Sequence, residues 1–372
     1  MFVEAREFFS RLNFRYLFHY SSKMLNWQDT YRLSRFVVIR PADHGLVMES
    51  SLNNRQFPLR SVSVIRIIAA LAQPTQLESL LSCAKESERE VLCSFLDACD
   101  QAQFLTRVGE DGVTEEDAGP LGYWEFHDLL FHTASRFGRN RRPIGGTYRL
   151  KDRLPPESPL DSDEGYSQIA LPTPGMDVLN LRLHEALTQR RSQYGRKPLT
   201  IEALGAFTYW TCRVTNVRST GNDVHLQKLY PSGGSLHPLR VYIAIESCEG
   251  CPPGLYRYLD RVHSLAKVPA PEGAVRKFLS DAAYNTGGLA QRPTMLFIIS
   301  ACFQRTAWKY ESIAYRLVLL ETGTLLQTMY LAATALGLKA CAIGCGDSDY
   351  FAQTAKTDYY RETSVGEFLL GA

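Results

Sequence analysis

Short apolar runs separated by turn residues dominate the first third of the chain. Residues 36–39 and 45–48 flank a Pro-Ala-Asp-His turn, and this spacing predicts a two-stranded hairpin. Residues 55–60 offer a third strand. The pattern therefore predicts a small β-structure near the beginning of the chain.

Helical periodicity follows these strands. Residues 61–72 carry apolar side chains three and four positions apart, and residues 88–104 predict another helix. Between them, Thr75 and Glu78 have the spacing of a capping box, which predicts a short helix after Pro74. Strands followed by three helices are typical of a winged-helix-like module.

Residues 109–174 carry fewer regular patterns. Residues 109–119 predict an acidic loop, and residues 124–137 predict an aromatic-rich helix. Residues 136–142 contain four arginines, which favour a solvated basic loop over contact with an acidic peptide or a partner subunit. Residues 154–174 are rich in Pro, Ser and Asp and have the composition of a linker.

The remainder of the chain alternates helices with strongly apolar strands. Helices are expected at residues 177–189, 200–212 and 315–336, and strands at residues 241–245, 254–258, 263–265, 294–301, 339–343 and 367–370. The predicted class is α+β, with a winged-helix-like domain at residues 1–155, a linker at 156–176 and a second domain at 177–372. No GxGxxG or P-loop motif is present in the sequence.

Composition narrows the functional classes. The 372 residues carry 41 basic and 39 acidic side chains, a formal net charge of +2, which argues against a general nucleic-acid or membrane-surface binder. No apolar run approaches the ~20 residues of a membrane span. Residues 1–20 lack the apolar centre of a signal peptide and predict a charged amphipathic helix, so we expect a cytoplasmic protein.

Nine cysteines are spread along the chain. Cys248 and Cys251 form one CxxC, but no second pair completes a zinc site. We therefore predict reduced, mostly buried thiols and no bound metal.

Three separated segments have candidate chemistry. Arg190, Arg191 and Ser192 could hold a phosphate through charge-assisted hydrogen bonds, although such a triplet is usually a surface helix end. Residues 230–238, YPSGGSLHP, precede a buried strand, and their paired glycines would let the backbone approach a ligand closely. Lys309 and Tyr310 precede the long helix and could place a base beside a phenol.

Together these segments resemble a known family. YPSGGSLHP, GLYRY followed by His263, KYESIAYR, and the long segment ending in ACAIG are similar to SagB-type dehydrogenases of the nitroreductase superfamily. Those enzymes act in the biosynthesis of thiazole/oxazole-modified peptides. The resemblance covers residues 177–372, while WEFHDLLFH and GGTYR resemble the N-terminal extension of longer members. It implies a nitroreductase-like FMN-binding α/β sandwich.

The resemblance also implies a set of site residues. Lys309 and Tyr310 match the pair regarded as catalytic in azoline oxidation. The implied FMN contacts are Arg190, Arg191, Ser192, Pro231, Ser232, Gly233, Gly234, Ser235, His237, Gly344, Gly346 and, as a candidate for the phosphate, Arg361. Two positions depart from the usual pattern: Tyr194 stands where a basic residue is common, and Cys345 where a polar contact is common.

The implied function is FMN-dependent oxidation of thiazoline or oxazoline rings to thiazole or oxazole, in a homodimer that binds an azoline-containing peptide and can partner a cyclodehydratase. Two alternatives remain open. One is a generic NAD(P)H-dependent nitro- or quinone reductase, which would turn over NADPH with a quinone and ignore azolines. The other is a non-catalytic scaffold subunit of a cyclodehydratase complex, which would purify without flavin.

Overall fold

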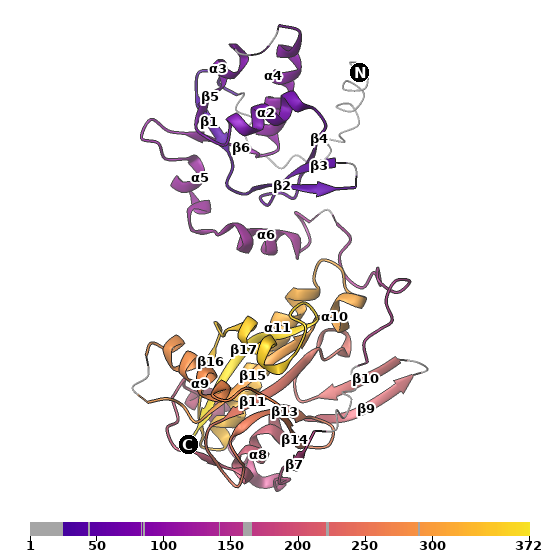
Figure 1. Ribbon diagram of the computed structural model, residues 1–372, viewed down its shortest axis with the longest axis vertical. Coiled ribbons are helices and arrows are strands. Elements are labelled where there is room, and N and C mark those ends of the chain that lie inside the picture. Colours follow the sequence, from indigo (N-terminus) through magenta and orange to yellow (C-terminus); the bar gives the residue numbers. More distant parts are fainter. Residues whose placement is uncertain are drawn as a thin grey trace. The chain divides into compact units, whose positions relative to one another are not determined.

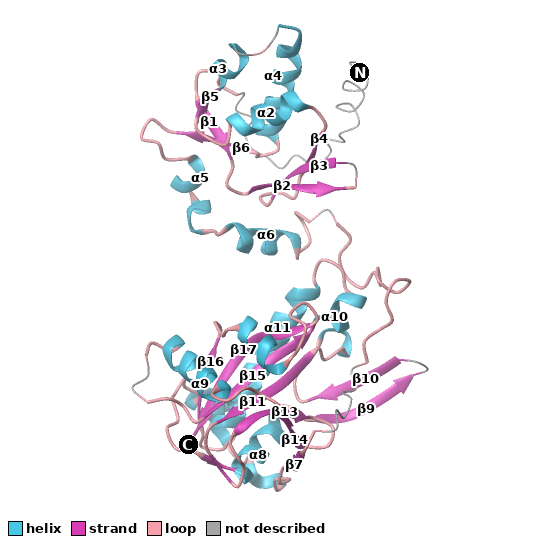
Figure 2. Ribbon diagram, in the orientation of Figure 1, coloured by secondary structure: helices cyan, strands magenta, loops and turns pink. Residues whose placement is uncertain are grey.

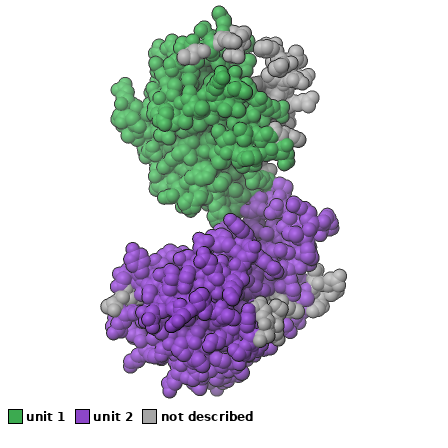
Figure 3. Space-filling view, viewed as in Figure 1, with its two compact units in different colours: residues 1–142 green, residues 143–372 purple. Residues whose placement is uncertain are grey.

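The computed structural model describes residues 25–43, 45–82, 84, 86–140, 142–158, 166–220, 223–288 and 291–372. The helix expected at residues 1–20 lies outside this part of the chain. The chain divides into two compact units, Met1–Arg142 and Pro143–Ala372 (Figure 3). The boundary thus falls before the one expected after residue 155, because residues 143–155 fold with the second unit.

Unit 1 contains two small antiparallel sheets (Figure 1). The first has the order β2-β3-β4, from β2 (Val37–Ala42), β3 (Gly45–Ser50) and β4 (Gln56–Leu59), which are the three predicted strands. The second has the order β5-β1-β6, from β1 (Thr30–Leu33), β5 (Thr75–Gln76) and β6 (Leu105–Val108). The strands of this second sheet have two to four residues, too few for a periodic signal.

Three helices complete the core of unit 1: α2 (Val62–Ala70), α3 (Leu77–Ser82) and α4 (Glu86–Gln101). Their apolar faces meet the sheets around Phe95, Leu96 and Leu71. The capping box expected at Thr75 is wrong, because Thr75 lies in β5 and its hydroxyl donates to the Ala70 carbonyl at 3.0 Å. The predicted strands and helices occur, with β1, β5 and β6 added to the expected order, and the winged-helix-like arrangement stays a prediction.

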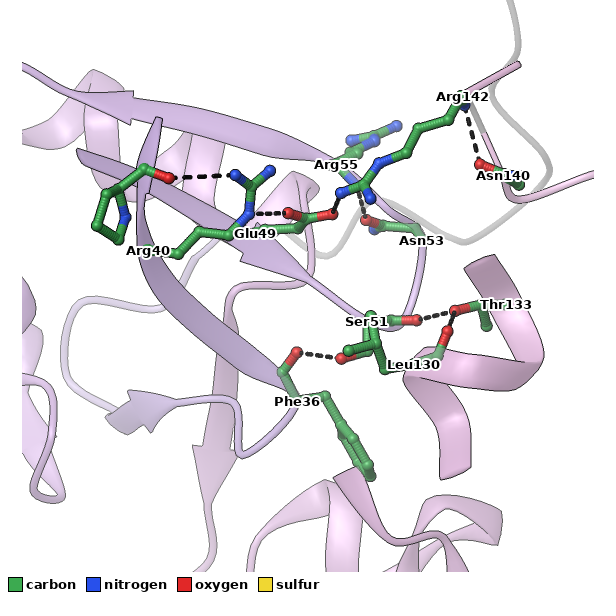
Figure 4. A network of polar contacts seen from close by, with 11 residues as sticks. Phe36, Arg40, Glu49, Ser51, Asn53, Arg55, Leu130, Thr133, Asn140 and Arg142 are labelled. Carbon is green, nitrogen blue, oxygen red and sulfur yellow. Dashed lines mark hydrogen bonds and ion pairs between the residues drawn. The ribbon is translucent and has the colours of Figure 1, made fainter. Parts of the chain in front are cut away.

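Unit 1 also has a second, smaller hydrophobic core. It is built by α5 (Glu115–Ala118), the 3-10 helix η1 (Pro120–Tyr123) and α6 (Phe126–Ala134). Leu129 of α6 packs with Phe36 and Leu52. The Thr133 hydroxyl donates to the Ser51 carbonyl at 2.8 Å and ties α6 to the end of β3 (Figure 4).

The arginine-rich loop is partly fixed to unit 1. The buried carboxylate of Glu49 receives Arg40 Nε at 2.8 Å and Arg142 Nη2 at 2.7 Å (Figure 4). Arg139 donates to the Leu52 carbonyl at 2.5 Å. Arg139 and Arg142 are exposed, as expected for a solvated loop, and their guanidinium groups also bind a strand-end carbonyl and a buried acid.

Unit 2 is organised around a seven-stranded antiparallel sheet with the order β16-β17-β15-β11-β13-β14-β7 (Figure 2). Its strands are β7 (Gln168–Ala170), β11 (Leu239–Ile245), β13 (Gly254–Leu259), β14 (Ser264–Val268), β15 (Met295–Cys302), β16 (Lys339–Ile343) and β17 (Glu362–Gly371). Strand β7 lies inside the expected linker and adds an edge by pairing with β14. The expected linker at residues 156–176 thus contains part of the sheet.

Helices cover both faces of this sheet. They are α7 (Leu183–Gln189), α8 (Ile201–Thr211), α9 (Ala274–Asn285), α10 (Phe303–Lys309), α11 (Ala314–Ala335) and α12 (Ser348–Ala355). In β15, Phe297 and Ile299 pack toward α8 and α11, whereas Leu296 and Ile298 pack toward α9 and α12. Burial on both faces explains why the central strands are apolar at nearly every position.

Some elements differ from the sequence expectation. The helix expected from residue 177 begins at Leu183, after a short 3-10 helix, Met176–Val178. A hairpin of β9 (Val214–Thr220) and β10 (Asp223–Lys228), unpredicted because its residues are mostly polar, projects from the sheet (Figure 1). Strand β17 begins at Glu362, well before residue 367, and its first half is rich in buried polar residues. Within the described ranges, no helix combines the length and apolar character needed to cross a bilayer.

Candidate flavin site

Helix α11 connects the predicted cofactor segments. Ser192 is hydrogen-bonded to the Tyr330 hydroxyl at 2.9 Å, and Ser232 donates to the Glu321 carboxylate at 2.5 Å. The Tyr330 hydroxyl also accepts from the Ala342 amide of β16 at 2.8 Å. Both segments are therefore anchored on one long helix, although residues 190–192 and 231–237 are far apart in the sequence.

The two anchors lie on opposite sides of α11. Glu321 and Tyr330 are nine positions apart (330 − 321), which places them about 13 Å apart along the axis and roughly 180° apart around it. The buried stripe of the helix, with Val318, Leu325 and Met329, separates them on the inner side. The two segments are therefore attached to different sides of α11.

The 231–237 segment is a strained turn. Gly234 has φ 66°, and both Ser235 (φ 55°) and His237 (φ 42°) adopt the left-handed region that non-glycine residues rarely enter. The Ser232 side chain stabilises the turn, because its hydroxyl oxygen accepts a hydrogen bond from the His237 amide at 2.9 Å. Strain of this kind persists where the surroundings fix the backbone, which is common at ligand sites.

The glycines of the turn meet the Lys309–Tyr310 pair. A Cβ atom on Gly234 would lie 2.7 Å from the Tyr310 hydroxyl and 2.9 Å from Lys309 Nζ. On Gly233 it would lie 3.2 Å from a methyl group of Leu317 of α11. The second and third predicted segments are therefore brought together in one protomer, and Gly234 leaves the space that both functional groups occupy.

Lys309 and Tyr310 stand at the end of α10, with Lys309 as its last residue. Both are half-buried. Lys309 Nζ lies 5.5 Å from the centre of the Tyr310 ring and 5.9 Å from that of Tyr148. Aromatic rings at this distance attract an ammonium group, so the lysine is held between two tyrosines.

The His237 side chain is buried in the protein at the end of the turn. It is 3% exposed, and its Nδ1 lies 3.6 Å from Glu321 Oε1. Its ring packs edge-on against buried Tyr230, with centroids 5.6 Å apart. The Arg305 guanidinium donates to the His237 carbonyl at 3.1 Å. We therefore assign His237 to positioning the turn, because its side chain is directed into the protein.

In the 190–192 segment, the guanidinium group of Arg190 is available to bind a ligand. The Arg190 guanidinium stacks on the Tyr330 ring at 5.2 Å and is half-buried. Exposed Arg191 folds back to donate to the Thr188 and Arg190 carbonyls at 2.8 Å. Arg190 and the Ser192 hydroxyl thus form a fixed polar pair, and Arg191 would have to leave the helix end to join them.

The glycines after β16 lie in different environments. Gly344 is exposed with open space at its Cβ position. Gly346 packs directly on the buried Glu367 carboxylate, which accepts from its amide. Burial raises the pKa of Glu367 to about 7, although the Gly346 hydrogen bond opposes the rise. The Gly346 amide is therefore already occupied.

Arg361 is not brought to the other basic residues. It precedes β17, is exposed, and lies 3.6 Å from Glu157. The 190–192 segment approaches the opposite end of the strand, where Gly195 packs on Gly371. The ten residues of β17 span roughly 30 Å. Within one protomer, Arg361 and Arg190 cannot bind the same phosphate, contrary to the expectation.

Several residues of this centre were not found from the sequence. Glu321 and Leu317 lie in a helix whose pattern predicted only burial, and Tyr330 looked like another apolar-face residue. Tyr148 is remote in sequence. The polar Glu321 in the apolar stripe of α11 was the one available signal, because buried acids are rare without a partner.

Comparison with known proteins identifies the class. Residues 187–371 match the nitroreductase family model. The nitroreductase-family protein MJ1384 of Methanocaldococcus jannaschii is 32% identical over 170 residues, which cover 45% of this chain and 81% of the relative. The chain belongs to the nitroreductase family.

A second match distinguishes this chain within the family. Residues 31–141 match the model of cyanobactin oxidase ThcOx. The microcin B17-processing protein McbC of Escherichia coli is 27% identical over 154 residues, 39% of this chain and 54% of McbC. The trifolitoxin-processing protein TfxB of Rhizobium leguminosarum is 31% identical over 126 residues, 33% of each chain. The resemblance to the SagB-type branch is confirmed.

Two solved structures are among those similar to this chain. The E. coli microcin synthetase McbBCD complex with truncated pro-MccB17 bound has a chain with 21% identity and a TM-score of 0.41, covering 65% of this chain and 86% of that one. A nitroreductase from Anabaena variabilis has 20% identity and a TM-score of 0.47, covering 64% of this chain and 45% of that one.

Proposed function

We propose that this protein is an FMN-dependent oxidase that converts thiazoline or oxazoline rings of a peptide into thiazole or oxazole. The observation that carries the proposal is the contact of Gly234 with both Lys309 and Tyr310 in a nitroreductase-family domain. The ThcOx-type unit before it and the likeness to two peptide-processing proteins support a peptide substrate.

The residues present fit a flavin mononucleotide. Arg190 and Ser192 offer charge-assisted donors for a phosphate or ribityl chain. Gly233 and Gly234 carry no side chain, so Leu317, Lys309 and Tyr310 approach the backbone of the turn that the family resemblance places at the flavin. Bound FMN would supply the hydride acceptor that amino-acid side chains lack.

The chain's own residues would handle the proton. Aromatising an azoline removes one proton and one hydride from adjacent carbons. Lys309 Nζ and the Tyr310 hydroxyl both lie against Gly234, where one of the two would accept the proton from the ring carbon and the other would orient the ring. Molecular oxygen is the expected final oxidant.

We propose a homodimer that completes the cofactor site. One protomer holds its two cofactor segments on opposite sides of α11, and the outer stripe between them exposes Leu319 and Leu320. A second copy packed on this stripe would bring residues 231–237 of one chain near residues 190–192 of the other. An exposed apolar stripe on a long helix is a typical subunit contact.

Unit 1 is proposed to recognise the peptide or a cyclodehydratase partner. Its two small sheets leave edge strands that an extended peptide could lengthen by β-augmentation. Photo-crosslinking from a labelled azoline peptide should map to residues 25–140. Crosslinks confined to residues 166–372 would oppose this role.

The decisive experiment is anaerobic mixing of the purified yellow protein with an azoline peptide. Flavin bleaching with formation of an azole, two hydrogens lighter by mass, is expected. Bleaching by NADPH with a quinone as acceptor, and none by azolines, would instead support a generic reductase. A protein that purifies without flavin and cannot take up FMN would support a scaffold.

A further inference from the structure

Residues 143–157 form a strap over the end of α10. The Pro143 carbonyl accepts from the Ser312 hydroxyl at 2.8 Å. Gly145 and Glu311 form an antiparallel bridge with amide–carbonyl distances of 3.2 and 2.9 Å. The Tyr148 amide then donates to the Lys309 carbonyl at 3.1 Å. The strap is thereby attached on both sides of Tyr310.

Further contacts hold the rest of the strap along α10. The Trp308 indole donates to the Leu154 carbonyl at 2.8 Å, and the Gln304 amide donates to the Pro155 carbonyl at 2.9 Å. The Thr147 hydroxyl donates to the Glu311 carboxylate at 2.8 Å. Two of these bonds use backbone carbonyls of the strap and the third uses the Thr147 side chain, so the strap is held at several points along α10.

Tyr148 is the strap residue that reaches the centre. Its φ of 54° is in the left-handed region, so its place is imposed by the contacts around it. Its ring packs edge-on against Trp308 at 5.5 Å, and its centroid lies 5.9 Å from Lys309 Nζ. Gly146 lies between two tyrosines: a Cβ there would be 4.0 Å from ring carbons of both Tyr148 and Tyr310.

We propose that Tyr148 is a positioning residue for Lys309 and that the strap is a structural part of the active centre. The proposal rests on the proposed function. Without such contacts, the four-carbon side chain of Lys309 on the last turn of α10 would sample many rotamers. In the folded chain, Lys309 Nζ lies 5.9 Å from the Tyr148 ring centre, 5.5 Å from the Tyr310 ring centre and against Gly234 of the turn.

The test is a double-mutant cycle on the full chain. Tyr148→Leu should lower the single-turnover rate of azoline oxidation roughly 3- to 10-fold, as expected for losing one cation–π contact and the order it imposes. Tyr148→Phe keeps the ring and should restore a rate within about twofold of wild type. In a Lys309→Ala background, Tyr148→Leu should change the remaining rate less than about twofold, because Tyr148 acts through Lys309.

A second variant distinguishes the loss of Lys309 positioning from a loss of folding. Gly146→Val retains Tyr148 but inserts methyl groups beside both tyrosine rings, at a position with unstrained φ. It should slow oxidation in wild type and not in Lys309→Ala. Equal fold losses in both backgrounds would overturn the positioning role. If instead Lys309→Ala itself oxidised azolines at the wild-type rate, the proposed function of the pair would fail, which is a different result.

Discussion

At the residue scale, Gly234 is the point where the 231–237 turn meets Lys309 and Tyr310 at the end of α10. Its left-handed φ and its contacts with Lys309 and Tyr310 have one cause, a turn held by Ser232 and Glu321. The two side chains proposed to perform the chemistry both approach the backbone of Gly234. Three residue-scale predictions follow from this arrangement and from Glu367.

Lys309→Ala should lower single-turnover azole formation by roughly 10²- to 10⁴-fold, the usual effect of losing a positioned acid or base. Its half-buried side chain contributes little to packing, so the melting temperature and flavin spectrum should stay near wild type. Tyr310→Phe tests the hydroxyl alone. Wild-type bleaching rates in both variants would remove the pair from the mechanism.

Gly234→Ala should slow azoline oxidation at least tenfold. The added methyl group would meet Lys309 Nζ and the Tyr310 hydroxyl, and φ 66° is unfavourable for alanine by about 1 kcal/mol. Gly175→Ala is the matched control, because that glycine has an ordinary φ and open space. Equal activity of the two variants in stopped-flow would contradict the close contact.

Glu367→Gln should change how stability depends on pH. Burial raises the Glu367 pKa from 4.5 to about 7, so the folded state favours the protonated acid. The stability it contributes is complete below pH 4.5 and is lost as pH rises through 7, by up to about 3 kcal/mol. In urea unfolding at pH 4.5 and 8, the free energy of unfolding of the variant should rise relative to that of wild type at pH 8. An unchanged difference would refute the raised pKa.

At the element scale, α11 is the helix on which the cofactor segments are mounted. It buries one stripe on the sheet and uses its two flanks, through Glu321 and Tyr330, to hold residues 231–237 and 190–192. An amphipathic pattern alone describes the buried stripe and says nothing about the flanks. The flanks give the helix its place in the proposed cofactor site.

Arg190→Ala with Arg191→Ala should weaken FMN retention by about 10-fold or more, since a charge-assisted donor contributes ~1.5–3 kcal/mol. Equilibrium dialysis of released flavin measures this. Arg182→Ala is the control, because that arginine forms only a surface pair with Glu185. Equal FMN affinity in the double variant and the control would place the phosphate elsewhere.

At the scale of the whole molecule, the proposed second copy would complete the cofactor site. Leu320 is 58% exposed on the outer stripe of α11. Leu320→Asp should give a monomer in light scattering that has lost most of its FMN, because a charge at a subunit contact costs several kcal/mol. Val262→Asp, equally exposed at the turn between β13 and β14, is the control. A flavin-loaded Leu320→Asp monomer would show that one chain suffices.

Much of the architecture could be predicted from the sequence. The central strands β11, β15 and β16 and the helix α11 were located because their apolar runs are long and bounded by turn residues. The motif at residues 230–238 and the Lys309–Tyr310 pair indicated the family. Those signals are local, so neighbouring residues carry them.

Only the tertiary structure decided how these parts meet. Tyr148 reaches Lys309, and Glu321 reaches Ser232, through contacts between residues 89 or more positions apart, which leave no periodic trace. Arg361 and Arg190 looked compatible in sequence, yet a ten-residue strand separates them. The local patterns specify elements because each residue's neighbours set its backbone preferences, whereas the site depends on the packing of α11, α10 and the strap, which only the folded chain fixes.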